Sequence, residues 1–211
     1  MYKQLLKDRT EAGFLLSETL KKYQNTNSVI LAVPRGGVPV GFVISKTLHL
    51  PLDIVLAKKI GHPNNKEFAI GAVSMDSMIL DEHPEVPKKY IDHEINRLRQ
   101  LLQEKYELYN GNRKPIDIEN KNVILVDDGI ATGNTLLASI AMLLKKNPAK
   151  IIVAVPVLPY DTVSIFEKNA DEFIYLIASS YFRGVGSLYE EFDQVDDEEV
   201  IRMLSVINTT E

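Results

Sequence analysis

The chain has 211 residues, of which 45% are apolar and 25% charged, with 11 glycines and 10 prolines; this composition is typical of a folded globular protein and excludes the disordered and fibrous classes. The formal net charge of -5 gives no sign of the basic surface that a nucleic-acid binder needs, so we expect no nucleic-acid partner. Because cysteine is absent, disulfides, thiolate metal sites and cysteine nucleophiles are excluded.

No stretch of the sequence reaches the ~18 to 20 consecutive apolar residues that would span a bilayer. The amino-terminal segment carries Asp8, Arg9 and Glu11 where an export signal would need an apolar core. We therefore expect a cytoplasmic protein with no membrane partner.

Short apolar runs rich in β-branched residues, each bounded by polar, Pro or Gly residues, predict buried parallel strands. They cover residues 28–33, 52–57, 123–126, 151–155 and 173–177. Helix-length segments separate them at residues 38–48, 134–146 and 161–169. This alternation predicts an α/β fold with an open, mainly parallel sheet and helices on both faces.

Three further segments complete the predicted organisation. Residues 8–23 have helical apolar spacing and predict an amphipathic helix packed on the sheet. A charged helix at about residues 88–109, within a helical insertion at about residues 84–112, is expected to be an insertion, a cap or a dimer surface. The acidic stretch at residues 193–199 starts a terminal helix. Since no long linker interrupts the chain, residues 1–211 are expected to form a single domain.

The most informative stretch is an apolar strand that runs into the adjacent carboxylates Asp127 and Asp128, then into a Gly/Thr loop and a helix. Gly129 and Gly133 allow close backbone approach, and the free N–H groups at a helix amino terminus favour an anion. This arrangement predicts a cradle for one phosphate. The carboxylates would repel that phosphate, but they can accept hydrogen bonds from sugar hydroxyls or bind a divalent cation. A phosphate next to a diol suggests a ribose 5-phosphate.

Residues 123–135 as a whole resemble the phosphoribosyl-pyrophosphate (PRPP) motif of the type I phosphoribosyltransferases. By that resemblance Asp127 and Asp128 would hold the ribose 2- and 3-hydroxyls, and they are also the candidate metal ligands. The remaining residues implied to bind PRPP here are Gly129, Ile130, Ala131, Thr132, Gly133, Asn134 and Thr135. The alternatives are a tight strand-to-helix turn without a ligand and a Walker P-loop, which matches less well because Asn134 stands where a lysine is needed.

A second loop, at residues 31–41, also runs from a strand to a helix. Its Arg35 places a cation beside the backbone N–H groups of Gly36 and Gly37, which suits a pyrophosphate. In the family, the loop after the first sheet strand binds the pyrophosphate of PRPP. The resemblance therefore implies that Arg35, Gly36 and Gly37 bind PRPP.

Residues 58–71 combine two adjacent lysines with a polar stretch that contains Gly and Pro, and we expect a mobile loop there. In the family, a flexible loop at this place closes over PRPP and excludes water. By resemblance Lys58 or Lys59 would contact pyrophosphate oxygens, and Lys66 would do so on closure. The alternative is that they are surface lysines beside a turn. The four histidines show no metal-ligand spacing, so a zinc site is not expected.

The acceptor side of the site is less defined by the sequence. In the family, the nucleophilic base binds under a small hood built from the chain ends, which we expect at about residues 156–195. Residues 181–192 loosely resemble the carboxyl-terminal segment of the 6-oxopurine enzymes. The candidates for acceptor contacts, offered against the alternative of simple core packing, are Tyr181, Phe182, Arg183 and Tyr189.

Two departures from the 6-oxopurine enzymes argue against hypoxanthine or guanine as the acceptor. Ser187 stands where those enzymes carry an acid that helps to bind magnesium, and Ala131 stands where they carry an aspartate near the base. The overall pattern most resembles a group of bacterial predicted phosphoribosyltransferases of undefined substrate.

The resemblance implies a magnesium-dependent enzyme that transfers ribose 5-phosphate from PRPP to a nitrogen nucleophile, expected to be a nucleobase, with inversion and release of pyrophosphate. Its catalytic residues, acting through electrostatics and positioning, would be Arg35, Lys58, Lys59, Asp127 and Asp128. The rival hypotheses are a PRPP-sensing regulator without transferase activity and a phosphatase or pyrophosphohydrolase. The sequence names neither the acceptor nor the oligomeric state; a homodimer is left open, because dimers are common in the family.

Overall fold

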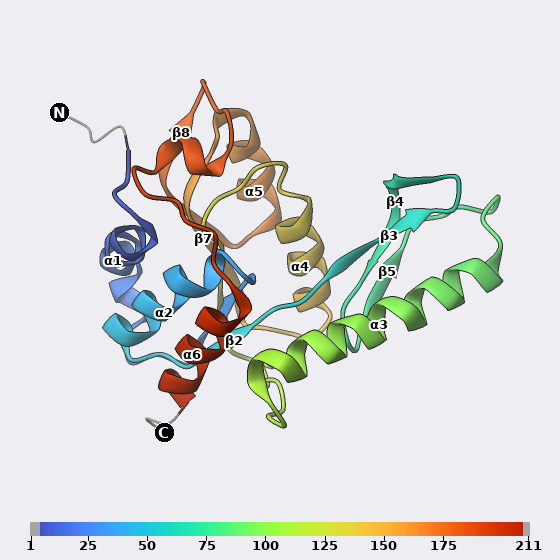
Figure 1. The fold of residues 1–211 in the computed structure, drawn as a ribbon, viewed down its shortest axis with the longest axis horizontal. Helices are drawn as coiled ribbons and strands as arrows, with labels where there is room; N and C mark the ends of the chain where they lie inside the picture. Colours follow the sequence, from blue (N-terminus) through green and yellow to red (C-terminus); the bar gives the residue numbers. More distant parts are fainter. Residues whose placement is uncertain (1–4, 209–211) are drawn as a thin grey trace.

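The centre of the molecule, in a computed structural model that describes residues 5–208, is a five-stranded sheet. Its strands are β1 (Ser28–Ala32), β2 (Leu52–Ile54), β6 (Asn122–Val126), β7 (Lys150–Pro159) and β8 (Glu172–Ser179). They lie in the order β2-β1-β6-β7-β8, and every pairing is parallel. The predicted parallel sheet is confirmed (Figure 1).

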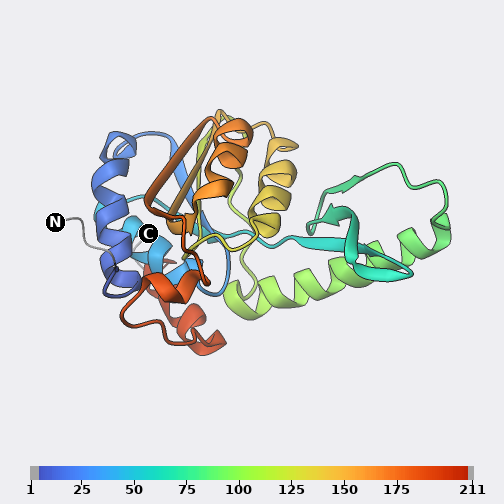
Figure 2. The ribbon, with the colours of Figure 1, turned by 90° about the horizontal axis from the view of Figure 1, so that it is seen from above.

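Helices cover both faces of this sheet, as predicted, and Figure 2 shows the strands between the two layers. The first face carries α1 (Arg9–Leu20), α2 (Gly37–Leu48) and α6 (Asp197–Asn208). The second face carries α4 (Asn134–Leu144) and α5 (Val163–Asn169). Neighbouring residues of a strand point to opposite faces of the sheet: Ile124 packs on the first face and Leu125 on the second. The strands are apolar throughout because both of their faces are buried.

Local signals set several element boundaries. Asp8 caps α1, because its carboxylate accepts a hydrogen bond of 2.8 Å from the N–H of Glu11. The predicted helix at residues 8–23 is α1 followed by a short 3-10 turn, η1 (Lys21–Tyr23). Two further 3-10 turns are η2 (Tyr160–Thr162) and η3 (Val185–Leu188).

Strand β7 continues past Pro156, beyond the predicted end of the strand, to Pro159. Its pairing with β6 ends at Ala154; beyond it β8 is the paired strand, and on the other side the N–H of Ile130 in the loop after β6 donates to Val157 O at 2.9 Å. Because no partner on the β6 side needs the missing N–H, the proline does not break the strand. The longer strand carries η2 above the carboxyl edge of the sheet.

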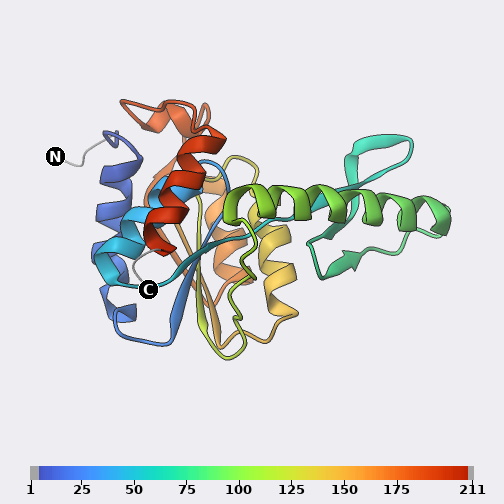
Figure 3. The ribbon, with the colours of Figure 1, turned by 60° about the horizontal axis from the view of Figure 1, so that its bottom comes forward.

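The prediction of a loop at residues 58–71 is wrong, and the mobility of this segment stays a prediction. This segment forms an antiparallel hairpin of β3 (Lys58–His62) and β4 (Asn65–Val73), which β5 (Met78–Leu80) extends. The long helix α3 (Lys88–Asn110) lies along this second sheet. Figures 1 and 3 show these elements reaching well beyond the main sheet, and we call residues 58–110 the arm.

The apolar residues of the arm explain why local pattern failed there. Ile60, Ile70 and Val73 are buried, and they pack with Leu98 and Leu102 of α3. In the sequence these strand residues are scattered among Lys, Asn, Gly and Pro, so the strand signal is weak. The hairpin is held by a tertiary contact with a helix that follows it in the chain.

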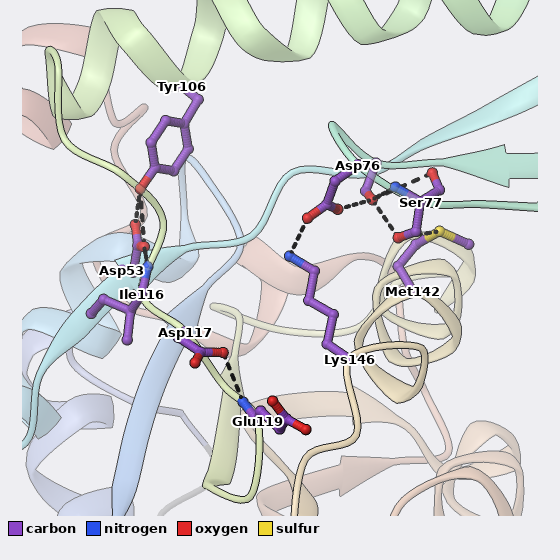
Figure 4. A network of polar contacts seen from close by, with 10 residues as sticks. Asp53, Asp76, Ser77, Tyr106, Ile116, Asp117, Glu119, Met142 and Lys146 are labelled. Atoms are coloured by element: carbon purple, nitrogen blue, oxygen red, sulfur yellow. Dashed lines mark hydrogen bonds and ion pairs between the residues drawn. The ribbon is translucent and has the colours of Figure 1, made fainter.

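A buried carboxylate ties α3 to the main sheet. Asp53 in β2 is 5% exposed, and its side chain accepts hydrogen bonds from Tyr106 Oη at 3.0 and 3.1 Å and from Asn110 Nδ2 at 3.0 Å. The N–H of Ile116 donates to the same carboxylate at 2.9 Å (Figure 4). Burial raises the pKa of Asp53 despite these donors.

A second set of polar contacts in Figure 4 fastens the arm to the end of α4 and to the turn that follows it. The Nζ atom of Lys146 lies 2.6 Å from Asp76 Oδ2, and the hydroxyl of Ser77 points to the sulfur of Met142. Asp53 and Asp76 thus both fasten the arm to the main part of the molecule.

Replacing Asp53 by Ala is expected to lower the free energy of unfolding by about 2–4 kcal/mol, because buried donors from Tyr106, Asn110 and Ile116 lose their acceptor. Urea unfolding followed by circular dichroism measures the loss. The control, Asp53→Asn, keeps the shape and one acceptor oxygen and is expected to lose less. Equal stability of Asp53→Ala and the wild type would refute this role for Asp53.

Two segments near the chain ends, residues 6–7 and 188–191, pair over the carboxyl edge of the sheet. Leu6 forms a parallel bridge with Tyr189, and the N–H of Glu190 donates to Leu6 O at 2.8 Å. Within the segment at residues 156–195 that we expected to form a hood, residues 163–179 are α5 and β8 of the main sheet. Over the part of the chain that the structure describes, no helix is both long and apolar enough to cross a membrane.

Candidate active site

The candidate site lies where two strand-to-helix loops start side by side. Strands β1 and β6 are neighbours, with Ala32 opposite Val126. From this pair the chain winds to β2 on one side and to β7 on the other, so the crevice between them is the topological switch point at which open α/β sheets bind ligands. The β1–α2 loop (residues 33–36) and the β6–α4 loop (residues 127–133) flank it.

Gly36 and Gly37 allow these two loops to touch. A Cβ atom on Gly36 would lie 2.0 Å from Asp128 Oδ2, and one on Gly37 would lie 2.7 Å from Val126 O. Any larger side chain would therefore push the β1–α2 loop away from the carboxylates. The two glycines keep the backbone beside Arg35 close to Asp128.

Asp128 is held by a residue whose part in the site the sequence did not indicate. Arg9 Nε and Nη2 lie 2.9 and 2.8 Å from Asp128 Oδ2, although the two residues are 119 positions apart. The same guanidinium donates to Asp193 O at 2.8 Å and lies 3.8 Å from the ring centroid of Phe192. We call Arg9, Asp128, Phe192 and Asp193 the terminal clamp. No local pattern links Arg9 to Asp128, because the contact requires the pairing of the chain ends.

Tyr189 reinforces this clamp through the backbone of Asp128. Its side chain is buried, and its hydroxyl donates to Asp128 O at 2.7 Å. Burial and the charge of Asp128 raise the pKa of Tyr189 far above its ordinary range. Tyr189, which the sequence suggested as an acceptor contact, therefore holds the backbone of Asp128 in place.

Asp127 lies against protein atoms at the end of β6. Its Oδ1 accepts a hydrogen bond of 2.8 Å from the N–H of Asp128. Desolvation and the neighbouring charge of Asp128 raise its pKa well above 3.8. The two carboxylates therefore differ. Asp127 is poorly solvated and close to a like charge, whereas Asp128 is ion-paired with Arg9.

The β6–α4 loop exposes a polar rim at the start of α4. Thr132, Asn134 and Thr135 are exposed, and Gly133 reaches the helix through a left-handed φ of +79°. A Cβ atom on Gly133 would lie 2.9 Å from the ring of Phe166, which adds a packing reason for glycine. In contrast, the Ile130 side chain is 1% exposed in the core, so only its backbone is available to a ligand.

The predicted lysines lie across a cavity from that rim. The cavity has a volume of about 840 Å³ and separates the arm from the start of α4, with Lys58, Lys59, Thr132 and Thr135 among its lining residues. Lys59 Nζ is ion-paired with Glu67 Oε2 at 2.7 Å. Lys58 has no hydrogen-bond or ion-pair partner within residues 5–208, so its charge is available to a ligand.

A second cavity, of about 540 Å³, continues the first toward the β1–α2 loop. Lys58 and Thr135 line both cavities, and Arg35 and Lys105 line the second. Together they form one groove, which we call the cationic groove, with Arg35, Lys58 and Lys105 along it. Arg35 Nη1 lies 3.5 Å from Asp197 Oδ1.

Asp197 joins the cationic groove to α6. It lies 2.8 Å from Lys105 Nζ and accepts a hydrogen bond of 2.6 Å from Tyr109 Oη. These donors lower the pKa of Asp197 to about 2, so the cluster remains charged in any ordinary buffer.

The acceptor candidates are spread over different places. A third cavity, of about 580 Å³, lies beside Ala131 and Thr132, and Phe182 lines it. Tyr181 is 92% exposed, and neither it nor Arg183 is among the residues that line this cavity.

No set of three His, Asp or Glu side chains that could hold a metal ion occurs within residues 5–208. The carboxylates that the motif brings to the crevice are the pair Asp127 and Asp128. Two carboxylates are too few to coordinate a metal ion with protein ligands alone. They fit a magnesium ion that keeps several waters and also contacts substrate phosphates.

The model of the phosphoribosyl transferase domain family matches residues 1–177. The chain therefore belongs to the phosphoribosyltransferase family, in agreement with the resemblance of its motif and with the fold.

Particular relatives support this membership. Proteins from two Mycobacterium tuberculosis strains (CDC 1551 / Oshkosh and ATCC 25618 / H37Rv), provisionally named phosphoribosyl transferases, are 34% identical over 206 residues, which are 95% of this chain and 46% of theirs. The chain thus spans about half the length of these curated relatives.

Solved structures show the same fold. The crystal structure of the protein TT1426 from Thermus thermophilus has a TM-score of 0.85 and 34% identity, and the match covers 95% of this chain and 97% of that one. A purine phosphoribosyltransferase from Pyrococcus horikoshii has a TM-score of 0.50 at 19% identity, over 89% of this chain and 93% of that one, a likeness of fold alone.

Proposed function

We propose that the protein transfers ribose 5-phosphate from PRPP to a nitrogen nucleophile, expected to be a nucleobase, and releases pyrophosphate. The observation that carries this proposal is the cationic groove, in which Arg35 and Lys58 lie with Thr135 of the α4 rim, while Arg35 also lines a cavity of about 350 Å³ with Asp128. One ligand with an anion at each end and a diol in the middle matches this order of groups.

In this proposal the 5-phosphate binds at Thr132, Asn134 and Thr135, where exposed side chains surround the amino terminus of α4. The ribose hydroxyls donate to Asp127 and Asp128. The family membership supports this assignment of the ligand groups, and the geometry permits it.

Catalysis then rests on charge placement. The bond from ribose C1 to the pyrophosphate oxygen breaks while a bond from C1 to the acceptor nitrogen forms, and the acceptor proton passes to solvent. Arg35 and Lys58 stabilise the negative charge that collects on pyrophosphate, and the carboxylates favour the positive charge that develops on ribose. No nucleophile from the protein is required.

Magnesium enters the proposal as part of the substrate. Bound to the pyrophosphate, it would neutralise the leaving group, with Asp127 and Asp128 as the protein carboxylates nearest to it. The homodimer and the cytoplasmic location stay predictions.

Replacing Lys58 by Met is the direct test, because Lys58 is a groove cation without a partner among the described residues. We expect the affinity for PRPP, measured by isothermal titration in the presence of magnesium, to fall at least about 10-fold, since a charged hydrogen bond contributes about 1.5–3 kcal/mol. Lys88→Met is the matched control, because Lys88 is exposed at the start of α3 and lines neither cavity of the groove.

Pyrophosphate release with a panel of nucleobases completes the test. Turnover with at least one base supports the transferase, whereas tight PRPP binding without turnover would favour a PRPP-sensing regulator. Absence of PRPP binding by the wild type would overturn the proposal.

A further inference from the structure

The third cavity, which we call the acceptor cavity, opens at the same sheet edge as the candidate PRPP site. Ala131 and Thr132 of the β6–α4 loop line it, together with Phe182. The remaining lining residues follow β7 and β8, which end at Pro159 and Ser179. Because the strands are parallel, their carboxyl ends bring these segments together beside the position proposed for ribose.

The acceptor cavity has one charged lining side chain among the described residues, Asp161. Asp161 is exposed in η2, and its side chain has no hydrogen-bond or ion-pair partner within residues 5–208. No Lys or Arg of the described chain lines the cavity to neutralise it. A ligand in the cavity therefore meets an uncompensated carboxylate.

The other polar side chains of the cavity are hydroxyl groups. The hydroxyl of Thr162 donates to Pro159 O at 2.8 Å, so its oxygen has only lone pairs left to offer. Ser179 Oγ accepts a hydrogen bond of 3.2 Å from the N–H of Tyr181, and its hydroxyl, like those of Thr132, Tyr160 and Ser180 on the lining, can donate to a ligand or accept from it. The group of the cavity that only accepts is the carboxylate of Asp161.

We infer that Asp161 binds the acceptor, and that the acceptor is a planar nitrogen heterocycle, uncharged or cationic, that carries an amino group. The exocyclic amino group of such a base donates to a carboxylate oxygen, and in the cationic form the protonated ring nitrogen beside it donates to the second oxygen. Phe182 offers an apolar surface for the ring. A carboxylated base would bring a second negative charge beside Asp161 with no cation to offset it, and is excluded.

This inference rests on the proposed transfer reaction, but it can be tested separately from it. Adenine serves as the amino-bearing probe, hypoxanthine as its oxo counterpart and nicotinate as the carboxylated base. Isothermal titration of each base, with and without PRPP and magnesium, measures the cavity directly. We expect binding of adenine in preference to the other two.

The variant Asp161→Asn is expected to weaken adenine binding, and to raise the KM for adenine in pyrophosphate release, by at least about 10-fold, because a charged acceptor is lost. Its affinity for PRPP should stay within about twofold of the wild type, since Asp161 lines none of the cavities at the PRPP loops. Glu167→Gln, on exposed α5 outside the cavity, is the matched control for the loss of one charge.

The outcomes separate the two proposals. Wild-type protein that binds PRPP but prefers nicotinate or hypoxanthine, or an Asp161→Asn variant that binds adenine normally, would overturn the acceptor inference alone. Adenine binding that depends on Asp161 without any PRPP binding would overturn the transferase alone. Binding of neither ligand would overturn both.

Discussion

Changing Asp127 to Asn is expected to weaken PRPP binding at least about 30-fold and, at the same time, to raise the free energy of unfolding by on the order of 1 kcal/mol. Binding falls because a neutral amide replaces a carboxylate that accepts from ribose hydroxyls in our proposal. Stability rises because Asp127 is poorly solvated and lies next to the like charge of Asp128. The amide oxygen can still accept from the N–H of Asp128, so the local backbone bond is kept.

This stability gain should depend on pH. The pKa of Asp127 is raised in the folded protein, so the folded state binds its proton more tightly than the unfolded chain does. The wild type therefore loses stability as the pH rises from about 4 through the folded pKa of Asp127. Below this range the difference between the wild type and Asp127→Asn should disappear, and above it the difference should be complete.

Asp128→Asn is the matched comparison, and it should lose PRPP binding but become less stable. Arg9 would then keep its charge with an amide as its only partner at that position. Urea unfolding at several pH values, without ligand, measures the change in the free energy of unfolding for each variant and shows whether it is a gain or a loss. If the two variants changed stability in the same direction, the different roles that we assign to these adjacent carboxylates would be wrong.

Replacing Arg9 by Met is expected to lower the free energy of unfolding by about 2–4 kcal/mol and to weaken PRPP binding at least about 10-fold. The side chains of Arg9 and Asp128 are only 12% and 14% exposed, so the change leaves a largely buried carboxylate unpaired. It also removes the contacts with Asp193 and Phe192 that join the chain ends. Arg9 thus acts as a positioning residue, through Asp128.

Arg9→Lys distinguishes charge from shape in this clamp. Lysine keeps the charge but cannot donate from two nitrogens to Asp128 Oδ2 and also lie flat on Phe192, so an intermediate loss is expected. Arg202→Met, a change on the exposed side of α6, is the control. A double-mutant cycle of Arg9→Met with Asp128→Asn should give a coupling energy of about 1–3 kcal/mol for PRPP binding. A coupling near zero would show that Arg9 does not act through Asp128.

The parallel sheet and the main motif could both be predicted from the sequence. Each depends on residues that are close in the chain: the apolar run of β6, the carboxylates that follow it and the Gly133 turn into α4 are all contained in residues 122–134. Buried parallel strands have a strong local signal, because both faces of each strand must be apolar. Because the motif is one continuous segment of the chain, the family could also be recognised from the sequence.

The arm, the terminal clamp and the acceptor cavity become visible only in the folded chain. The hairpin that follows β2 has a weak strand pattern, and its buried residues pack against α3. Arg9 reaches Asp128 because the chain ends pair, and Asp161 enters the acceptor cavity because three parallel strands end at one edge. Each of these features depends on contacts between residues far apart in the chain, which propensity and motif spacing do not encode.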